Sequence, residues 1–78
     1  MTANDKTTQE RVFKIIAQQF DSRFEISEDT RLEDLDADEV DEADIRIAIN
    51  EAFGKSFGRL DIEELETAQD WVRLVERS

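Results

Sequence analysis

Residues 32–44 read LEDLDADEVDEAD, and this stretch decides how the chain folds. Asp38 is a good helix N-cap, because a carboxylate oxygen accepts a hydrogen bond from a backbone N–H of the first helical turn. Asp41 then lies in that turn, where acidic side chains are favoured by the positive end of the helix macrodipole. The stretch therefore predicts a loop that ends at Ala37 and a helix that follows Asp38.

The predicted second helix has one broad apolar face and ends near Gly54, which can adopt the left-handed conformation that commonly closes a helix. The residues of that face recur at helical spacing and are Val40, Ala43, Ile47, Ala48, Ile49 and Phe53.

An earlier helix is predicted from roughly Thr8 to Phe20, where Thr7 and Glu10 form a possible capping box. Its apolar residues are Val12, Phe13, Ile15, Ile16 and Phe20. Residues 21–37 lack periodicity and are predicted to form a long loop. This loop has four apolar residues that can anchor it to a core, namely Phe24, Ile26, Leu32 and Leu35.

Two further helices are predicted towards the end of the chain. A short helix is expected from Asp61 to Glu66, with Ile62 and Leu65 pointing inward. A second capping box, Thr67 with Asp70, opens the last helix. The core residues of this helix are predicted to be Trp71, Val72, Leu74 and Val75. The expectation is one all-α domain over residues 1–78, a four-helix bundle with a long first loop and a short third helix.

The composition excludes several classes of function. The chain contains no cysteine and no histidine, so thiolate chemistry, cysteine-ligated zinc and Ser-His hydrolysis are ruled out. We therefore predict that the protein is not an enzyme and has no catalytic residue or metal ligand set. No apolar run is long enough to span a membrane or to act as a signal peptide, so a cytoplasmic protein is expected. The expected oligomeric state is a monomer.

The net charge of −11 would repel nucleic acids and anionic membranes, and it favours a basic protein partner. Eight of the twelve residues from Glu33 to Asp44 are acidic and none is basic. Helix capping explains some of these carboxylates. Eight together repel one another, so a docking surface for Lys and Arg side chains is the sharper interpretation. A calcium-binding EF-hand loop that starts at Asp34 is rejected. Its sixth position needs glycine but is Glu39, and its twelfth position needs glutamate but is Ile45.

Residues 32–41, LEDLDADEVD, resemble the acyl carrier protein motif Glu-Asp-Leu-Gly-Ala-Asp-Ser-Leu-Asp. The flanks are similar to the same family, and the resemblance covers nearly the whole chain. These flanking segments are Glu10-Arg11-Val12, Ile15-Ile16, Glu51-Ala52-Phe53 and Thr67-Ala68. The resemblance implies an acyl-carrier-like four-helix fold.

The family attaches 4'-phosphopantetheine to a serine at the start of its second helix, and Glu39 stands at that position here. A carboxylate has no hydroxyl to modify, so no cofactor is expected. Asp36 replaces a family glycine and Val40 replaces a leucine. The hydroxyl residues near this region lie outside any Asp-Ser-Leu context and are interpreted as turn or cap residues: Ser22, Ser27, Thr30 and Ser56.

The resemblance also implies a partner-binding face on the second helix. The residues assigned to this face are Asp36, Asp38, Glu39, Val40, Asp41, Asp44 and Ile47. Arg46 and Asn50 differ from the family and suggest a different choice of partner. Phe57 and Leu65 match residues around the family's acyl-chain cavity, although plain core residues are the better interpretation.

Three functions stay open at this point. The first is a non-catalytic interaction module in acyl-chain metabolism, of the fatty-acid or polyketide kind, that docks onto basic faces of carrier-dependent enzymes or a regulatory protein. The second is a genuine acyl carrier in lipid or polyketide biosynthesis, modified at another site or seen here in a serine-substituted form. The third is noncovalent binding of a small apolar ligand inside the bundle.

Overall fold

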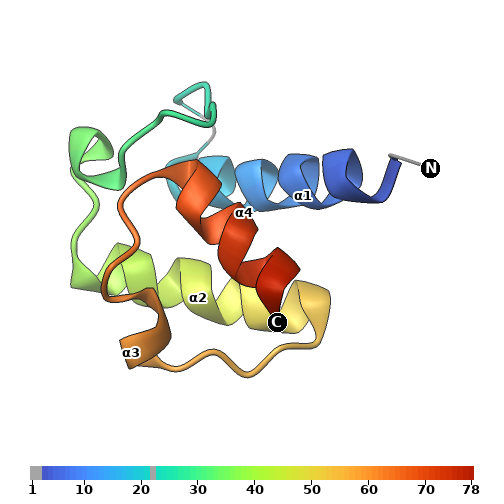
Figure 1. Ribbon diagram of the computed structural model, residues 1–78. Helices are drawn as coiled ribbons and strands as arrows, with labels where there is room; N and C mark the ends of the chain where they lie inside the picture. Colours follow the sequence, from blue (N-terminus) through green and yellow to red (C-terminus); the bar gives the residue numbers. More distant parts are fainter. Residues whose placement is uncertain (1–2, 22) are drawn as a thin grey trace.

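The computed structural model describes residues 3–21 and 23–78, and Figure 1 shows how its helices are arranged. Helix α1 spans Ala3–Gln19, a 3₁₀ turn η1 spans Leu32–Leu35, and α2 spans Glu39–Phe53. Helix α3 is a single turn at Arg59–Ile62, and α4 spans Ala68–Arg77. Helix α1 contacts both α2 and α4. The described residues form no β-strand, so the all-α class is confirmed.

Helix α1 is longer than predicted. It begins at Ala3 instead of Thr8, so Thr7 lies within the helix and the predicted capping box with Glu10 is wrong. The reason is that nothing upstream of Thr7 is a glycine or proline, the residues that end helices most strongly. Val12, Ile16 and Phe20 are buried at four-residue spacing, as the sequence predicted.

The loop after α1 is anchored largely as predicted. Leu32 and Leu35 are buried in η1, a 3₁₀ turn that the sequence did not predict, and Ile26 packs against the core. Phe24 is a weaker anchor, because its side chain is 37% exposed and meets the buried Phe20 ring edge-on with 5.8 Å between ring centroids.

Backbone hydrogen bonds tie this loop to the start of α4. The Leu32 N–H donates to the Glu66 carbonyl at 3.1 Å, and the Ala68 N–H donates to the Thr30 carbonyl at 2.8 Å. Between them, the Arg31 guanidinium pairs with the Glu66 carboxylate at 2.8 Å. These contacts hold η1 and the residues before α2 in place.

Helix α2 confirms its predicted ends. Asp38 is the N-cap, and Gly54 closes the helix with a φ of 65°. The predicted apolar face is wrong in part, because Val40 and Ile47 are exposed while Ile45, which that face omitted, is buried together with Ile49. Residues two positions apart are rotated by about 200° about the helix axis, so Ile45 and Ile47 point in nearly opposite directions.

Helix α3 starts two residues before the predicted Asp61 and ends at Ile62, four residues before the predicted Glu66, so Asp61 lies inside it. The Asp61 carboxylate accepts a hydrogen bond from the Gly58 N–H at 2.7 Å, so it supports the start of α3 from the third position. Ile62 is buried and Leu65 packs against the core, as predicted.

Helix α4 confirms its predicted start. Thr67 and Asp70 form the predicted capping box, with the Asp70 N–H donating to Thr67 Oγ1 at 3.2 Å. All four predicted core residues of this helix are buried: Trp71, Val72, Leu74 and Val75.

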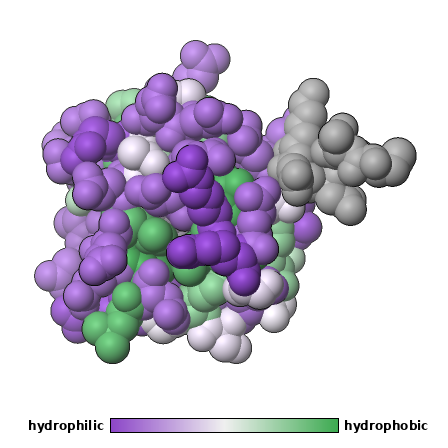
Figure 2. Space-filling model, viewed as in Figure 1, coloured by the Kyte–Doolittle hydropathy of each residue, from purple (hydrophilic) through white to green (hydrophobic). Residues whose placement is uncertain are grey.

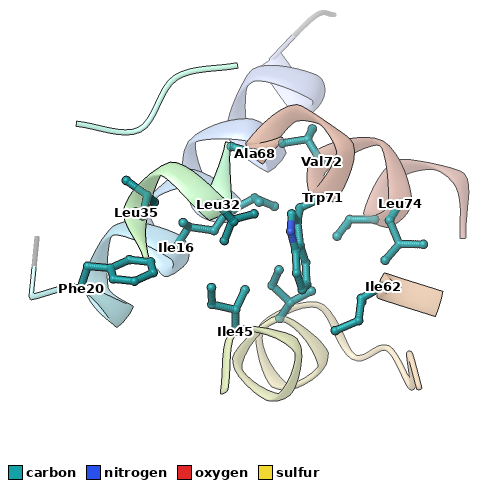
Figure 3. Close-up of a cluster of buried hydrophobic side chains, with 13 residues drawn as sticks. Ile16, Phe20, Leu32, Leu35, Ile45, Ile62, Ala68, Trp71, Val72 and Leu74 are labelled. Atoms are coloured by element: carbon teal, nitrogen blue, oxygen red, sulfur yellow. The ribbon is translucent and has the colours of Figure 1, made fainter. Parts of the chain in front are cut away.

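The core lies between α1, η1, α2 and α4. Figure 3 shows the Trp71 indole extending from α4 between Ile45 and Ile62, with Ile16 and Leu32 nearby. Trp71 is 2% exposed, and its Nε1 has no hydrogen-bond partner among the described residues. No helix in the described part of the chain is long and apolar enough to cross a membrane.

Candidate functional site

The candidate site is built on the first turn of α2. The Asp38 Oδ1 accepts from the Asp41 N–H at 2.9 Å, and the Asp41 Oδ2 accepts from the Asp38 N–H at 3.2 Å. This reciprocal pair satisfies backbone donors that have no partner within the helix. Two of the predicted docking carboxylates therefore also define where α2 begins. Glu39 lies between them in sequence, at the first helical position, and is exposed.

Asp36 has a backbone conformation that explains its place in the motif. Its φ is 60° and its ψ is 32°, the left-handed conformation, and it ends η1. Glycine adopts this conformation without steric cost, and Asp is one of the few other residues that tolerate it. Asp36 therefore occupies a turn position that glycine would also tolerate, and it adds an exposed carboxylate.

Gln19 connects the end of α1 to two of the predicted site residues. Its Nε2 donates to Asp41 Oδ1 at 3.1 Å and to Asp44 Oδ2 at 3.3 Å. One amide nitrogen carries two hydrogens, so it can hold both carboxylates at once. No local pattern in the sequence points to Gln19, because 22 residues separate it from Asp41.

The apolar members of the predicted face reach solvent. Val40 is 66% exposed and Ile47 is 47% exposed, and Leu60 on α3 is 80% exposed. Figure 2 shows apolar surface near α3, at the lower left, surrounded mostly by hydrophilic surface. Single exposed apolar residues are ordinary, and of these three only Val40 lines a depression of the surface.

That depression is a groove of about 590 Å³ between α2 and α3. Its apolar lining residues are Val40, Ala43 and Ile62. Its charged lining residues are Glu39, Glu42, Asp44, Arg46, Arg59 and Glu63. Of the predicted site, the structure places Glu39, Val40 and Asp44 in this groove. Asp36, Asp38, Asp41 and Ile47 lie outside its lining.

Glu42 is a lining residue of the groove whose pKa differs from its ordinary value. Partial burial raises its pKa above the ordinary value for a glutamate, and the nearby charges of Glu39, Asp38 and Asp41 raise it further. The sequence analysis did not assign Glu42 to the site. Its position one turn after Asp38 was a usable signal, because residues three and four apart share a helix face.

Two residues that were interpreted as specificity determinants have structural roles. Asn50 Nδ2 donates to the Phe57 carbonyl at 3.0 Å, and Arg46 Nη1 donates to the same oxygen at 3.1 Å. These bonds fix the loop between α2 and α3. Phe57 and Leu65, which the resemblance placed around an acyl-chain cavity, are half-buried against the core.

Among residues 3–21 and 23–78, no group of three or more carboxylates is arranged to hold a metal ion. No protein-family model, curated protein or solved structure matches this chain. The acyl carrier resemblance therefore stays a prediction that rests on residues 32–41 and their flanks.

Proposed function

We propose that this chain is an acyl-carrier-like protein-interaction domain that docks onto a basic protein surface through α2 and carries no covalent 4'-phosphopantetheine. The observation that carries the proposal is the exposed Glu39 at the first position of α2, within a surface of carboxylates. The resemblance puts the attachment serine at this position. A carboxylate cannot form the phosphodiester that such a serine makes, whereas it adds to an anionic docking surface.

The distribution of hydroxyl groups supports the proposal. The sequence has no serine or threonine between Thr30 and Ser56, an interval that includes all of α2. Thr30 Oγ1 accepts from the Ser27 N–H at 2.8 Å, and the two hydroxyls lie 3.1 Å apart, so both stabilise the turn in the first loop. Thr67 caps α4.

The charge of the surface supports a basic partner. Net charge of this size steers oppositely charged surfaces together, and the attraction weakens as salt screens it. In the setting that the resemblance suggests, the partner is a carrier-dependent enzyme of fatty-acid or polyketide metabolism, or a protein that regulates one.

The docking test is charge reversal at residues that cap nothing. Partners are cross-linked in the native host, identified by mass spectrometry and purified, and their affinity is measured by calorimetry. Changing Glu39→Lys together with Asp44→Lys should weaken binding at least tenfold, roughly 1.4 kcal/mol. The control is Glu10→Lys with Glu76→Lys, two exposed residues on α1 and α4 that alter net charge equally. Equal weakening by both pairs would mean that the total charge, and not the α2 surface, attracts the partner.

The chemical test separates an interaction domain from a carrier. The protein is incubated with coenzyme A and a broad-specificity phosphopantetheinyl transferase, and its intact mass is measured. We expect no increase in mass for the unaltered protein. The Glu39→Ser variant, run in parallel, shows whether the acceptor alone is missing. A pantetheine adduct on the unaltered protein would refute the proposal.

A further inference from the structure

The α2–α3 groove has opposite charges at its two ends. Glu39, Glu42 and Arg46 lie at i, i+3 and i+7 on one stripe of α2, so Glu39 and Arg46 are about 10 Å apart along the helix axis. Arg46 also donates to the Phe57 carbonyl at 3.1 Å, which places it at the start of α3, close to Arg59 in the chain. Arg46 and Arg59 therefore make one end of the groove basic, and Glu39 makes the end at the start of α2 acidic. Asp44 and Glu63 also line the groove, so its lining is acidic overall.

Apolar surface joins these ends. Ala43 lies between Glu39 and Arg46 on the same stripe, and Ile62 contributes from α3. Val40 also lines the groove and is 66% exposed, so a partner side chain can contact it. A volume of about 590 Å³ is enough to take up side chains of a partner and is within the range of natural binding pockets.

The secondary structure of α2 and α3, the two walls of the groove, limits which kind of peptide backbone can bind there. Both are helices in the described structure, and neither is a sheet edge to which an extended peptide could add a strand. A helix, in contrast, presents apolar side chains at i, i+3 and i+4 along one stripe and charged side chains beside it.

Resting on the proposed docking function, we propose that this groove holds a short amphipathic helix of the partner protein. Its apolar side chains lie against Val40, Ala43 and Ile62. Its Lys or Arg side chains face Glu39 and Glu42, and a carboxylate at its other end faces Arg59. The basic partner surface is therefore one helix with mixed charge, and the contact extends from α2 onto α3.

A fluorescein-labelled helical peptide can stand in for the partner helix in a binding test. The peptide has a leucine stripe, lysines at one end and glutamates at the other, and a scrambled peptide of identical composition is its control. Binding is followed by fluorescence anisotropy. We expect the patterned peptide to bind at least about tenfold more tightly than the scrambled one, because only it presents a contiguous apolar stripe.

Protein variants then locate the bound peptide. Val40→Ser should weaken binding of the patterned peptide about tenfold, whereas Ile47→Ser, an exposed apolar residue of α2 outside the groove lining, should change it less than about twofold. Arg59→Glu should weaken it, whereas Arg73→Glu, an exposed arginine of α4 with the same effect on net charge, should not. Circular dichroism confirms that each variant is folded.

Four outcomes would overturn the proposal. Equal binding of the patterned and scrambled peptides, or a larger effect of Ile47→Ser than of Val40→Ser, would show attraction by the α2 surface alone, which leaves the proposed docking function intact. Absence of binding at millimolar protein would reject a helix as the occupant. A homodimer in sedimentation equilibrium that Val40→Ser dissociates would assign the groove to a second copy of the chain.

Discussion

The side-chain amide of Asn50 hydrogen-bonds both backbone groups of Phe57. The Phe57 N–H donates to Asn50 Oδ1 at 2.9 Å, and Asn50 Nδ2 donates to the Phe57 carbonyl at 3.0 Å. Arg46 donates to the same carbonyl. Gly58, the N-cap of α3, follows directly, so a residue of α2 determines where the opposite wall of the groove begins.

Replacing Asn50 should therefore destabilise the fold. Asn50→Ala leaves the half-buried Phe57 N–H without its acceptor, and we expect a loss of about 1–3 kcal/mol in the free energy of unfolding. The measurement is urea denaturation followed by Trp71 fluorescence. Gln18→Ala, an exposed change on α1, should stay within about 0.5 kcal/mol of the natural protein. A similarly small loss for Asn50→Ala would show that water replaces the amide.

Asp70 predicts one pH dependence. The Glu66 and Thr67 N–H groups donate to its Oδ2 at 2.9 and 3.1 Å, and these bonds lower the pKa of the carboxyl below its ordinary value. The stabilisation is complete above the pKa of the unfolded chain and is lost as pH falls through the lower pKa of the folded state. Asp70→Asn should therefore lower the free energy of unfolding most at neutral pH. The measurement is urea denaturation at several pH values. A cost that did not shrink in acid would contradict the assignment.

Glu42 predicts a pH dependence of stability that is opposite in sign to that of Asp70. Its pKa is raised, first by burial and then by Glu39, Asp38 and Asp41, so the folded state disfavours its ionised form. The penalty is present above the folded pKa and disappears as pH falls to the unfolded pKa. Glu42→Gln should raise the melting temperature at neutral pH and should lose this advantage in acid. Glu76→Gln, an exposed substitution on α4, is the control, and an equal gain there would indicate a general effect of net charge.

Salt should stabilise the whole domain. A net charge of −11 on a chain of 78 residues repels itself in the compact state, and the Debye length shortens to about 10 Å at 0.1 M ionic strength. The exposed pair of Arg31 with Glu66 is weakened by the same screening, but such surface pairs contribute little. We expect the melting temperature to rise with sodium chloride and with magnesium. A flat titration would mean that the carboxylates do not limit stability.

The sequence predicted the parts of the candidate site that depend on near neighbours. Asp38 was identified as the N-cap of α2, and Glu39 was placed in its first turn. The groove was not predicted, and neither was the hydrogen bonding of Gln19 to Asp41 and Asp44. These features join α2 to α3 and to α1, and hydrophobic periodicity carries no information about which helices become neighbours.

The sequence by itself determined the ends of α2, the start of α4 and the buried face of α4. Each depends on residues three or four apart, whose contacts exist as soon as a turn of helix forms. Only the tertiary structure decided that Val40 and Ile47 face solvent, that Asn50 and Arg46 position the start of α3, and that a groove with two oppositely charged ends lies beside Glu39. The physical reason is that an exposed face and a groove are defined by what packs against a helix, and those neighbours come from distant parts of the chain.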